Sequence, residues 1–212
     1  MLFDIPNRMA EIALCVAFLP PFPDTPNKIR RVAILSLEFK ITRDPLVLEH
    51  YYQLRERCFR DELGLSGFDG SEDEQDRRSR ILVALQGGRC IGGVRISPRV
   101  TLTSQAHQLG LDKERCCMWE RFAIAPVMRT LDVFREFSHH LVNTSRDSGY
   151  HHAMVLSSLP NARFYRRCHS ALGVKFQIHR HVPHCAQGVF SGLEHYLSVA
   201  HLDQPDVQRI AV

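Results

Sequence analysis

Residues 81–96 read ILVALQGGRCIGGVRI, two apolar runs joined by the turn sequence QGGR. Each run has the length and the β-branched content of a strand. Gly87 and Gly88 suit a tight turn whose central residues need positive φ. We therefore expect a β-hairpin with strands at residues 81–85 and 90–96, and the elements on either side of it decide the fold.

Two elements are expected before this hairpin. Residues 32–41, VAILSLEFKI, have the composition of a strand. Residues 46–63 predict a helix, because apolar side chains from Val47 to Cys58 recur at helical spacing. Residues 64–79 join this helix to the hairpin and are expected to form a long acidic loop.

The elements expected after the hairpin alternate between strands and helices. Residues 118–125, MWERFAIA, predict a strand that Pro126 ends, and residues 131–148 predict an amphipathic helix. The other expected elements are a short helix within an irregular stretch at 98–115, a buried strand at 152–157, a helix at 161–172, a strand at 174–181 and a short helix after residue 191. The order β-α-β-β-β-α-β-α-β predicts an α/β (α+β) fold.

The 212 residues are enough to bury one sizeable core. Residues 1–30 are expected to be an N-terminal appendage, because four prolines between residues 20 and 26 mark a linker. Residues 31–212 would then form one domain. The apolar run at residues 12–22 is too short to span a membrane, and no strongly basic segment precedes it. Neither a membrane segment nor a signal peptide is expected.

The seven cysteines are an odd number and are scattered along the chain. They suggest no disulfide framework. Free thiols are typical of a reducing compartment, so we expect a cytoplasmic protein.

Charge is distributed unevenly along the chain. Residues 61–76 hold seven acids and no Lys or Arg, whereas residues 121–185 hold nine Lys or Arg and three acids. An acidic rim and a basic face are therefore expected. The net charge of +4 is weak, no nucleic-acid-binding motif is present, and nucleic acid is not an expected partner.

Short motifs follow one another in a fixed order between residues 33 and 182. They are RERCFRDELG at 55–64, DEQD at 73–76, GGVR at 92–95, RF at 121–122 and ARFYRR at 162–167, followed by Leu-Gly at 172–173. In this order they resemble the acyl-homoserine-lactone synthases and the related N-acyl amino acid synthases of the GNAT acyltransferase superfamily. The positions that match the N-terminal signature of these enzymes are Arg55, Phe59, Leu63 and Gly64, and the positions that match their Asp-x-x-Asp are Asp73 and Asp76.

The resemblance implies a GNAT-like three-layer sandwich in which two neighbouring strands of a central mixed sheet splay apart, between flanking helices. Here these are the strand ending at Ala125 and the strand at 152–157, which would accept the pantetheine arm of an acyl thioester. The implied activity moves a fatty acyl group from acyl carrier protein, or from CoA, to the amine of S-adenosylmethionine or an amino acid, as in quorum-sensing autoinducer synthesis. The acyl thioester is a co-substrate, and no permanently bound cofactor is implied.

The chemistry of amine acylation, together with the resemblance, indicates roles for individual residues. Glu120 would be the general base or hold a water that acts as one. Arg121 and Asp76 would complete the catalytic group, and Arg121 would join the network of charges that Arg55 forms with Asp73 or Asp76. The implied substrate-binding residues are Arg55, Phe59, Asp73, Arg95 and Phe122. A backbone N–H at residues 122–124 would stabilise the oxyanion. The alternative interpretation is structural: the carboxylates would belong to a solvated surface, and the two phenylalanines to the core.

Two further features concern partners. Acyl carrier protein is acidic, and a basic face would attract it. The residues expected to receive it are Arg129, Arg163, Arg166 and Arg167, with a generic solvated face as the alternative. The histidines between residues 179 and 184 have irregular spacing and no second cysteine pair, so no metal site is expected.

The chain departs from the acyl-homoserine-lactone synthase pattern at several positions. Leu65 replaces a Trp, Gln75 a Tyr and Met118 a Glu, while Glu120 directly precedes Arg121. The glycine-containing CoA motif common in GNAT enzymes is absent from residues 126–129. Three functions therefore stay open: an N-acyltransferase that uses S-adenosylmethionine or a free amino acid, a non-catalytic domain that binds acyl carrier protein, and an acetyl-CoA acetyltransferase.

Overall fold

The computed structural model describes residues 37–98, 102–181 and 188–203. The predicted N-terminal appendage, residues 1–30, lies outside the described residues, as does the first part of the strand predicted at 32–41.

Four strands form an antiparallel half of the sheet. β2 (Arg80–Gln86) and β3 (Arg89–Ser97) make the predicted hairpin, and the two glycines of its turn have φ of 56° and 79°. β1 (Leu37–Thr42) pairs with the other edge of β2, and β4 (Cys116–Ile124) pairs with β3. The hairpin is thus confirmed and lies inside the sheet.

Three strands complete the sheet, in the order β1-β2-β3-β4-β5-β7-β6. β5 (His152–Ser157) and β6 (Lys175–His179) were predicted, but β7 (Tyr196–His201) lies where a short helix was expected, so that prediction is wrong. β7 pairs with β5 and β6 and is covered on both faces. Residues 197–200 are therefore all buried, and the alternation of apolar and polar residues that marks a half-exposed strand is absent.

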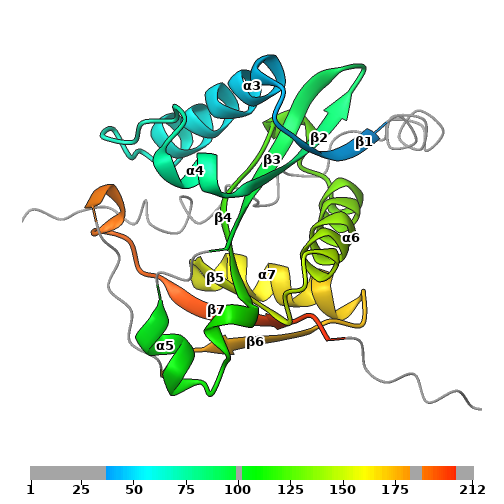
Figure 1. The fold of residues 1–212 in the computed structure, drawn as a ribbon. Coiled ribbons are helices and arrows are strands. Elements are labelled where there is room, and N and C mark those ends of the chain that lie inside the picture. The colour runs from blue at the N-terminus through cyan, green and yellow to red at the C-terminus, as the bar shows by residue number, and fades with distance from the viewer. Residues whose placement is uncertain (1–36, 99–101, 182–187, 204–212) are drawn as a thin grey trace, which may run out of the picture.

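Helices cover both faces of the sheet, which gives the predicted three layers (Figure 1). Those on one face are α3 (Pro45–Glu56), α4 (Glu74–Arg78) and α5 (Thr103–Gln108), and those on the other are α6 (Leu131–Asp147) and α7 (Leu159–Ser170). α3 continues directly into a π-helical turn, η1 (Arg57–Glu62), so the helix predicted at 46–63 has nearly its expected length. The remaining short helical turns are η2 (Lys113–Arg115), η3 (Pro126–Met128) and η4 (Gly188–Phe190).

The three longer helices begin at side chains that cap them. The Asp44 carboxylate accepts from the first backbone N–H groups of α3, and Pro45 follows at the first helical position. Thr130 and Ser158 cap α6 and α7 in the same way. Such oxygens satisfy N–H groups that have no partner inside the helix.

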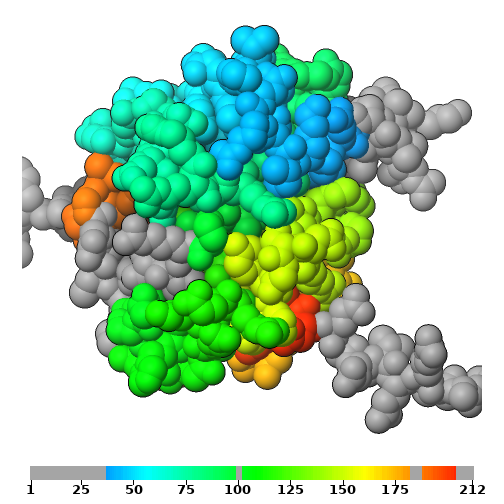
Figure 2. Space-filling view, in the orientation of Figure 1, coloured from blue at the N-terminus to red at the C-terminus, as the bar shows by residue number. Residues whose placement is uncertain are grey.

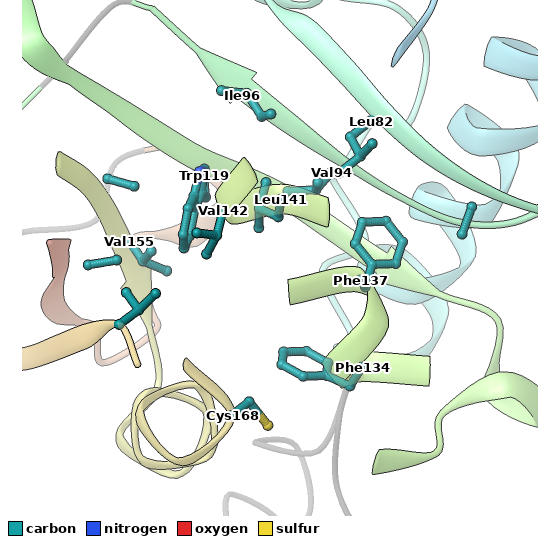
Figure 3. Packing of buried hydrophobic residues seen from close by; sticks show 14 of the residues in the cluster. Leu82, Val94, Ile96, Trp119, Phe134, Phe137, Leu141, Val142, Val155 and Cys168 are labelled. Atoms are coloured by element: carbon teal, nitrogen blue, oxygen red, sulfur yellow. The ribbon is translucent and has the colours of Figure 1, made fainter. Parts of the chain in front are cut away.

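Alternate side chains of β2 belong to two different cores. Leu82 and Ala84 pack towards α6 with Phe137 and Trp119. The close view of this core shows Leu82, Phe137 and Trp119 (Figure 3). The residues at 81, 83 and 85 pack on α3 instead. The period of two along a strand fixes this division between the layers.

β4 and β5 run parallel and pair over only three residues, from Cys116 with His152 to Met118 with Met154. Beyond Met118, β4 continues beside β3, and β5 continues beside β7. The two strands therefore separate near the middle of the sheet (Figure 1). This confirms the splay predicted for them.

A β-bulge interrupts β4 beside this opening. Gly93 pairs with Ala123 and Arg95 pairs with Glu120, so two residues of β4 oppose the single residue between them on β3. The first of the two, Arg121, has φ of 56° and is the only non-glycine residue with positive φ in the described ranges. The Tyr51 hydroxyl donates to the Arg121 carbonyl oxygen at 2.7 Å. α3 therefore stabilises the bulge directly.

We expect Gly93→Ala to disturb this contact. A methyl group on Gly93 would lie 2.3 Å from the Tyr51 ring, which is fully buried and has no space to move. The free energy of unfolding, measured with urea, should fall by about 1–3 kcal/mol. The matched control is Gly192→Ala, where the added methyl meets nothing within 4 Å. Equal stability of the two variants would show that Tyr51 is not tightly held.

His169 is buried in the α6 core between Trp119 and Phe176, with ring centroids 5.3 and 5.1 Å away. Its Nδ1 lies 2.8 Å from the Tyr165 carbonyl oxygen, so Nδ1 carries the proton. Nε2 is buried and has no hydrogen-bond partner among the described residues. Burial lowers the pKa of His169 to about 4. A charged imidazole is therefore strongly disfavoured in the folded chain.

This burial should make stability depend on pH. Between about pH 6.5 and pH 4 the unfolded chain binds a proton at His169 that the folded chain does not, so the free energy of unfolding falls as pH falls. The contribution should reach roughly 3 kcal/mol. His169→Phe should flatten the dependence measured by denaturation across this range, whereas the exposed control His107→Phe should leave its slope unchanged. Equal slopes for His169→Phe and the wild type would contradict the prediction.

Candidate active site

An arginine and a carboxylate form a buried ion pair between α3 and α4. The side chains of Arg55 and Asp76 are 1% and 0% exposed, and two parallel hydrogen bonds of 2.9 and 2.7 Å join them. Arg55 also donates to the carbonyl oxygens of Gly70 and Ser71, and its guanidinium lies 4.5 Å from the Tyr52 ring centroid. The pairing predicted for Arg55 is present, and Arg55 is not a surface cation.

The acidic segment is more ordered than the predicted loop at 64–79, because its last part forms α4. Asp73 caps this helix and accepts from the Asp76 N–H at 2.7 Å, while the Asp76 carboxylate accepts from the Asp73 N–H at 3.0 Å. This capping box holds both carboxylates in fixed positions. The interpretation of Asp76 as part of a solvated loop is therefore wrong.

Arg95 of β3 connects these carboxylates to β4. Its Nη1 lies 2.8 and 2.9 Å from the two Asp73 carboxylate oxygens and 3.2 Å from Asp76 Oδ1. Its Nε donates to Glu120 at 3.1 Å. We call Arg55, Asp73, Asp76, Arg95 and Glu120 the charge network. It joins two helices and two strands of one face of the sheet.

The charge network has three carboxylates and two guanidinium groups, hence one formal negative charge in excess. Burial alone would raise the pKa of Asp76, but hydrogen bonds from Arg55 and from the Asp73 N–H outweigh it and hold this pKa below its usual value. Burial opposes the charged form of Arg95, yet Glu120 and Asp73 raise its pKa. The Asp73 and Glu120 side chains are 43% and 22% exposed, so these two carboxylates are the ones that a cationic ligand can reach.

Arg121 lies outside the charge network, contrary to the prediction. Its guanidinium lies 5.1 Å from the Phe68 ring centroid and 4.7 Å from that of Phe190. No side chain in the described ranges forms a hydrogen bond or ion pair with it. Burial lowers the pKa of Arg121, and the positive charge of Arg95 adds to this effect. Arg121 is a cation held by aromatic rings.

The two phenylalanines predicted to bind substrate lie on opposite faces of the sheet. Phe59 of η1 stacks on Phe68 at 4.8 Å between centroids and belongs to the aromatic group around Arg121. Phe122 makes edge contacts with Phe134 and Phe137 of α6. Phe59 thus lies on the acidic side, and Phe122 lies against the α6 core.

The arginines predicted to receive an acyl carrier separate into two kinds. The prediction that Arg129 is an exposed docking residue is wrong. Its side chain is 11% exposed, pairs with Glu62 at 2.6 Å and donates to the Ile124 carbonyl oxygen at 2.9 Å. This arginine fastens the end of β4 to η1. The other three, all exposed on α7, are Arg163, Arg166 and Arg167. In the described part of the chain they have no ion-pair partner.

Three aromatic residues of the site were not predicted. Tyr51 was assigned only to the apolar stripe of a helix, although it is four residues before Arg55 and therefore shares its face. Phe68 and Phe190 were not singled out, and they are distant in sequence. Figure 2 shows the segment that contains η4, coloured orange, at the surface next to the cyan and teal residues that precede β2. The 5.9 Å separation of the two rings confirms that the segments touch.

One group in the described ranges has the spacing of metal ligands, although no metal site was predicted. Glu136, His139 and His140 of α6 place one ligand atom each within 4.8 Å of the others. His139 Nε2 already lies 3.0 Å from the Asn143 side-chain nitrogen, and His140 stacks on Phe39. The group lies outside the charge network. The histidine tract at 179–184 lies partly outside the described residues.

Comparison with known proteins gave matches among solved structures alone. No protein-family model matches the chain, and no curated protein matches its sequence. The acyl-homoserine lactone synthase LasI matches with a TM-score of 0.58 and 17% identity, over 79% of this chain and 90% of that chain.

Two other structures match about equally well. The CoA-dependent acyl-homoserine lactone synthase BjaI, with SAM and isopentyl-CoA, has a TM-score of 0.58 and 17% identity, over 80% of this chain and 84% of that chain. An acetyltransferase from Streptococcus agalactiae has a TM-score of 0.56 and 15% identity, over 78% of this chain and 98% of that chain.

This chain has the GNAT acyltransferase fold. The predicted fold class is confirmed. At these identities the likeness concerns the fold, which synthases and acetyltransferases share. None of the helices in the described ranges has both the length and the apolar character needed to cross a membrane.

We expect Asp76→Asn to destabilise the fold strongly. The variant keeps an oxygen for the α4 cap but removes the charge between Arg55 and Arg95. The free energy of unfolding should fall by about 3–5 kcal/mol, because an uncompensated charge is left buried. Denaturation with urea measures this change, and the exposed control Asp61→Asn should change stability by less than about 0.5 kcal/mol.

The pH dependence gives a second readout of the same variant. Because folding lowers the pKa of Asp76, its contribution to stability should be lost only as pH falls below about 4. The Asn variant should lack this loss. Wild-type stability of Asp76→Asn at pH 7 would contradict the importance assigned to the pair.

Proposed function

We propose that this protein is an N-acyltransferase that moves a fatty acyl group from a carrier thioester to the amine of an amino-acid-type acceptor. Acyl-homoserine lactone synthesis, as in quorum-sensing autoinducer production, and N-acyl amino acid synthesis are the two reactions of this kind. The observation that carries the proposal is the position of Glu120 and Asp73 beside the opening between β4 and β5. A carboxylate site for an ammonium would thus adjoin the opening that we propose for the acyl thioester.

The donor side of the proposal depends on the two strand edges that face this opening. Beyond Met118, β4 pairs with β3 and β5 pairs with β7, and the two strands no longer form ladder hydrogen bonds with each other. Backbone N–H and C=O groups need partners, and the amides of a pantetheine arm can supply them as an added strand would. The thioester carbonyl would then lie next to the bulge at Arg121.

The acceptor side depends on the excess negative charge of the network. Arg95 draws Glu120 and Asp73 together, and both keep exposed carboxylate surface. An ammonium between them would offset the excess charge. Glu120 is one residue before the bulge, which places it nearest to the expected position of the thioester.

The chemistry requires one proton acceptor before attack. Glu120 takes a proton from the ammonium, directly or through a water, and the amine lone pair then attacks the thioester carbon. The new C–N bond leaves an oxyanion, which backbone N–H groups at residues 122–124 would stabilise. The C–S bond breaks, the second amine proton passes to the departing thiolate, and Glu120 releases its proton to solvent. No acyl-enzyme is needed.

Acyl carrier protein is the donor we favour. Arg163, Arg166 and Arg167 present three exposed cations on α7, and an acidic protein would gain from them. The turn after β4 is a 3₁₀ helix that contains Pro126, without the glycines that let a backbone wrap a pyrophosphate. CoA remains the alternative carrier of the acyl group, since BjaI is described as a CoA-dependent synthase.

A domain that binds acyl carrier protein without turnover is the second candidate. Leu65 in place of a Trp and Met118 in place of a Glu are the features that favour it. Glu120, however, forms an ion pair with Arg95 and is partly exposed, as a general base must be. This geometry favours catalysis.

The test uses Glu120→Gln, which keeps the shape of the side chain and removes the base. Lipid extracts of bacteria that express wild type should contain an N-acyl amino acid or acyl-lactone, detected by mass spectrometry. Glu120→Gln should reduce it at least about 100-fold, and Asp73→Ala should also abolish it. The matched control Glu114→Gln, an exposed glutamate in η2, should behave as wild type.

Purified protein supplied with octanoyl–acyl carrier protein or octanoyl-CoA then identifies the donor. A second outcome is that folded wild type, given amino acids and S-adenosylmethionine, binds the acyl carrier without forming product. That result would contradict catalysis and support the second candidate, a domain that only binds acyl carrier protein. Full activity of Glu120→Gln would contradict the role of Glu120 as general base.

A further inference from the structure

Three side chains on one face of α6 have the atoms and the spacing of a metal site. Glu136 precedes His139 by three residues and His140 by four, so the three are neighbours on the helix surface. One carboxylate oxygen and one ring nitrogen of each histidine all lie within 4.8 Å of one another. The proposed acyl transfer uses none of these groups, because α6 covers the face of the sheet opposite the charge network.

The distances between the three groups are close to those that one ion requires. Zinc binds nitrogen and carboxylate oxygen at about 2.0–2.2 Å, so two ligands of one ion lie roughly 3–3.5 Å apart. The Glu136 and His139 side chains are exposed and can rotate to close the difference. The site can therefore form without a change in the helix.

His140 is held in place before any ion binds. Its ring stacks on Phe39 of β1, with centroids 4.4 Å apart and planes 10° from parallel. Burial and the neighbouring His139 lower the pKa of His140, so the neutral imidazole is favoured. The neutral form has the lone pair that a metal ion needs. A ligand that is already oriented also loses less conformational entropy on binding.

The other two groups can also ligate an ion. Glu136 forms no hydrogen bond or ion pair with a described residue outside this group. His139 Nε2 lies 3.0 Å from the Asn143 side-chain nitrogen. A half-turn of this amide would let the Asn143 oxygen accept from Nε2–H, which leaves the Nδ1 lone pair for the ion. Asn143 would then be the outer partner that fixes the tautomer of a metal-bound histidine.

We propose that Glu136, His139 and His140 form a binding site for one divalent transition-metal ion, with Zn²⁺ as the best match. Two imidazoles and a carboxylate suit Zn²⁺, Co²⁺ and Ni²⁺ better than Ca²⁺ or Mg²⁺, which prefer oxygen ligands alone. Three protein ligands leave at least one position of the ion for water. The proposal is independent of the proposed function.

The ion would strengthen the attachment of β1 to α6. β1 is at one edge of the sheet that the described strands form, and Phe39 contacts α6 through His140 and Phe137. An ion that fixes the His140 ring also fixes the surface on which Phe39 packs. The role of the ion is thus structural, because an ion that binds only the folded chain stabilises it.

The experiment measures metal binding to the full-length protein. Bound metal is removed with EDTA, the EDTA is removed by dialysis, and Co²⁺ or Zn²⁺ is titrated in by calorimetry. The Co²⁺ complex should show the visible spectrum of nitrogen and oxygen ligands, without the charge-transfer bands of thiolates.

Variants of two ligands test the assignment. Loss of an outer partner already weakens metal binding about 10–100-fold, so loss of a ligand should weaken it at least about tenfold. Glu136→Gln and His140→Phe should both show this effect, and His140→Phe keeps an aromatic ring against Phe39. Added Zn²⁺ should raise the Tm of wild type and leave that of the two variants unchanged.

Two controls exclude other histidines. Glu49→Gln/His50→Gln removes an exposed Glu–His pair of α3 and should bind metal as wild type does. His179→Gln/His181→Gln changes the other histidine-rich segment and should also leave the affinity unchanged. Circular dichroism checks that each variant folds. If His140→Phe does not fold, the exposed Glu136→Gln carries the test.

Three results would overturn the proposal. The first is that folded wild type binds neither Co²⁺ nor Zn²⁺. The second is that Glu136→Gln, and His140→Phe where it folds, bind metal with wild-type affinity. The third is that His179→Gln/His181→Gln abolishes the binding, which would place the ion elsewhere. None of these results bears on the proposed acyl transfer.

Discussion

The structure of the acidic side depends on the burial of one carboxylate between two guanidinium groups. Asp76 is fully buried and bonds to Arg55 and Arg95, so its position is determined from α3 and from β3 at once. A buried ion pair is a weak source of stability, but it tolerates few alternative geometries. Here it forces the acidic segment into a short capped helix against the sheet. Asp73 then bonds to Arg95 while part of its carboxylate stays exposed.

The same helix controls the second special feature of the fold. Tyr51 and Arg55 are one helical turn apart on α3, and the first bonds to the bulge of β4 while the second bonds to α4. Close approach of Tyr51 requires Gly93, which has no side chain in its path. Helix α3 therefore positions the carboxylates and the strained backbone together. A shift of this helix would alter both.

Local pattern predicted most of the fold, and long-range packing accounts for the rest. The hairpin, the helix at 131–148 and the pairing of Arg55 could be predicted, because turn glycines, apolar periodicity and motif spacing are local signals. β7 was missed because a strand buried on both faces loses its alternation. Arg129 looked like a surface cation, since sequence does not reveal that Glu62 and the end of β4 surround it. Phe190 reaches Arg121 from 69 residues away, a contact for which no local signal exists.

The bulge in β4 lies where the acyl donor and the amine acceptor of the proposed reaction would meet. The residue before it, Glu120, faces the charge network, and the residue after its first position, Phe122, faces the aromatic core of α6. An acyl chain requires apolar surroundings, and an ammonium requires carboxylates. β4 separates these two environments, and the bulge lies where the strand passes between them, beside the opening between β4 and β5. The proposed reaction would take place at that point.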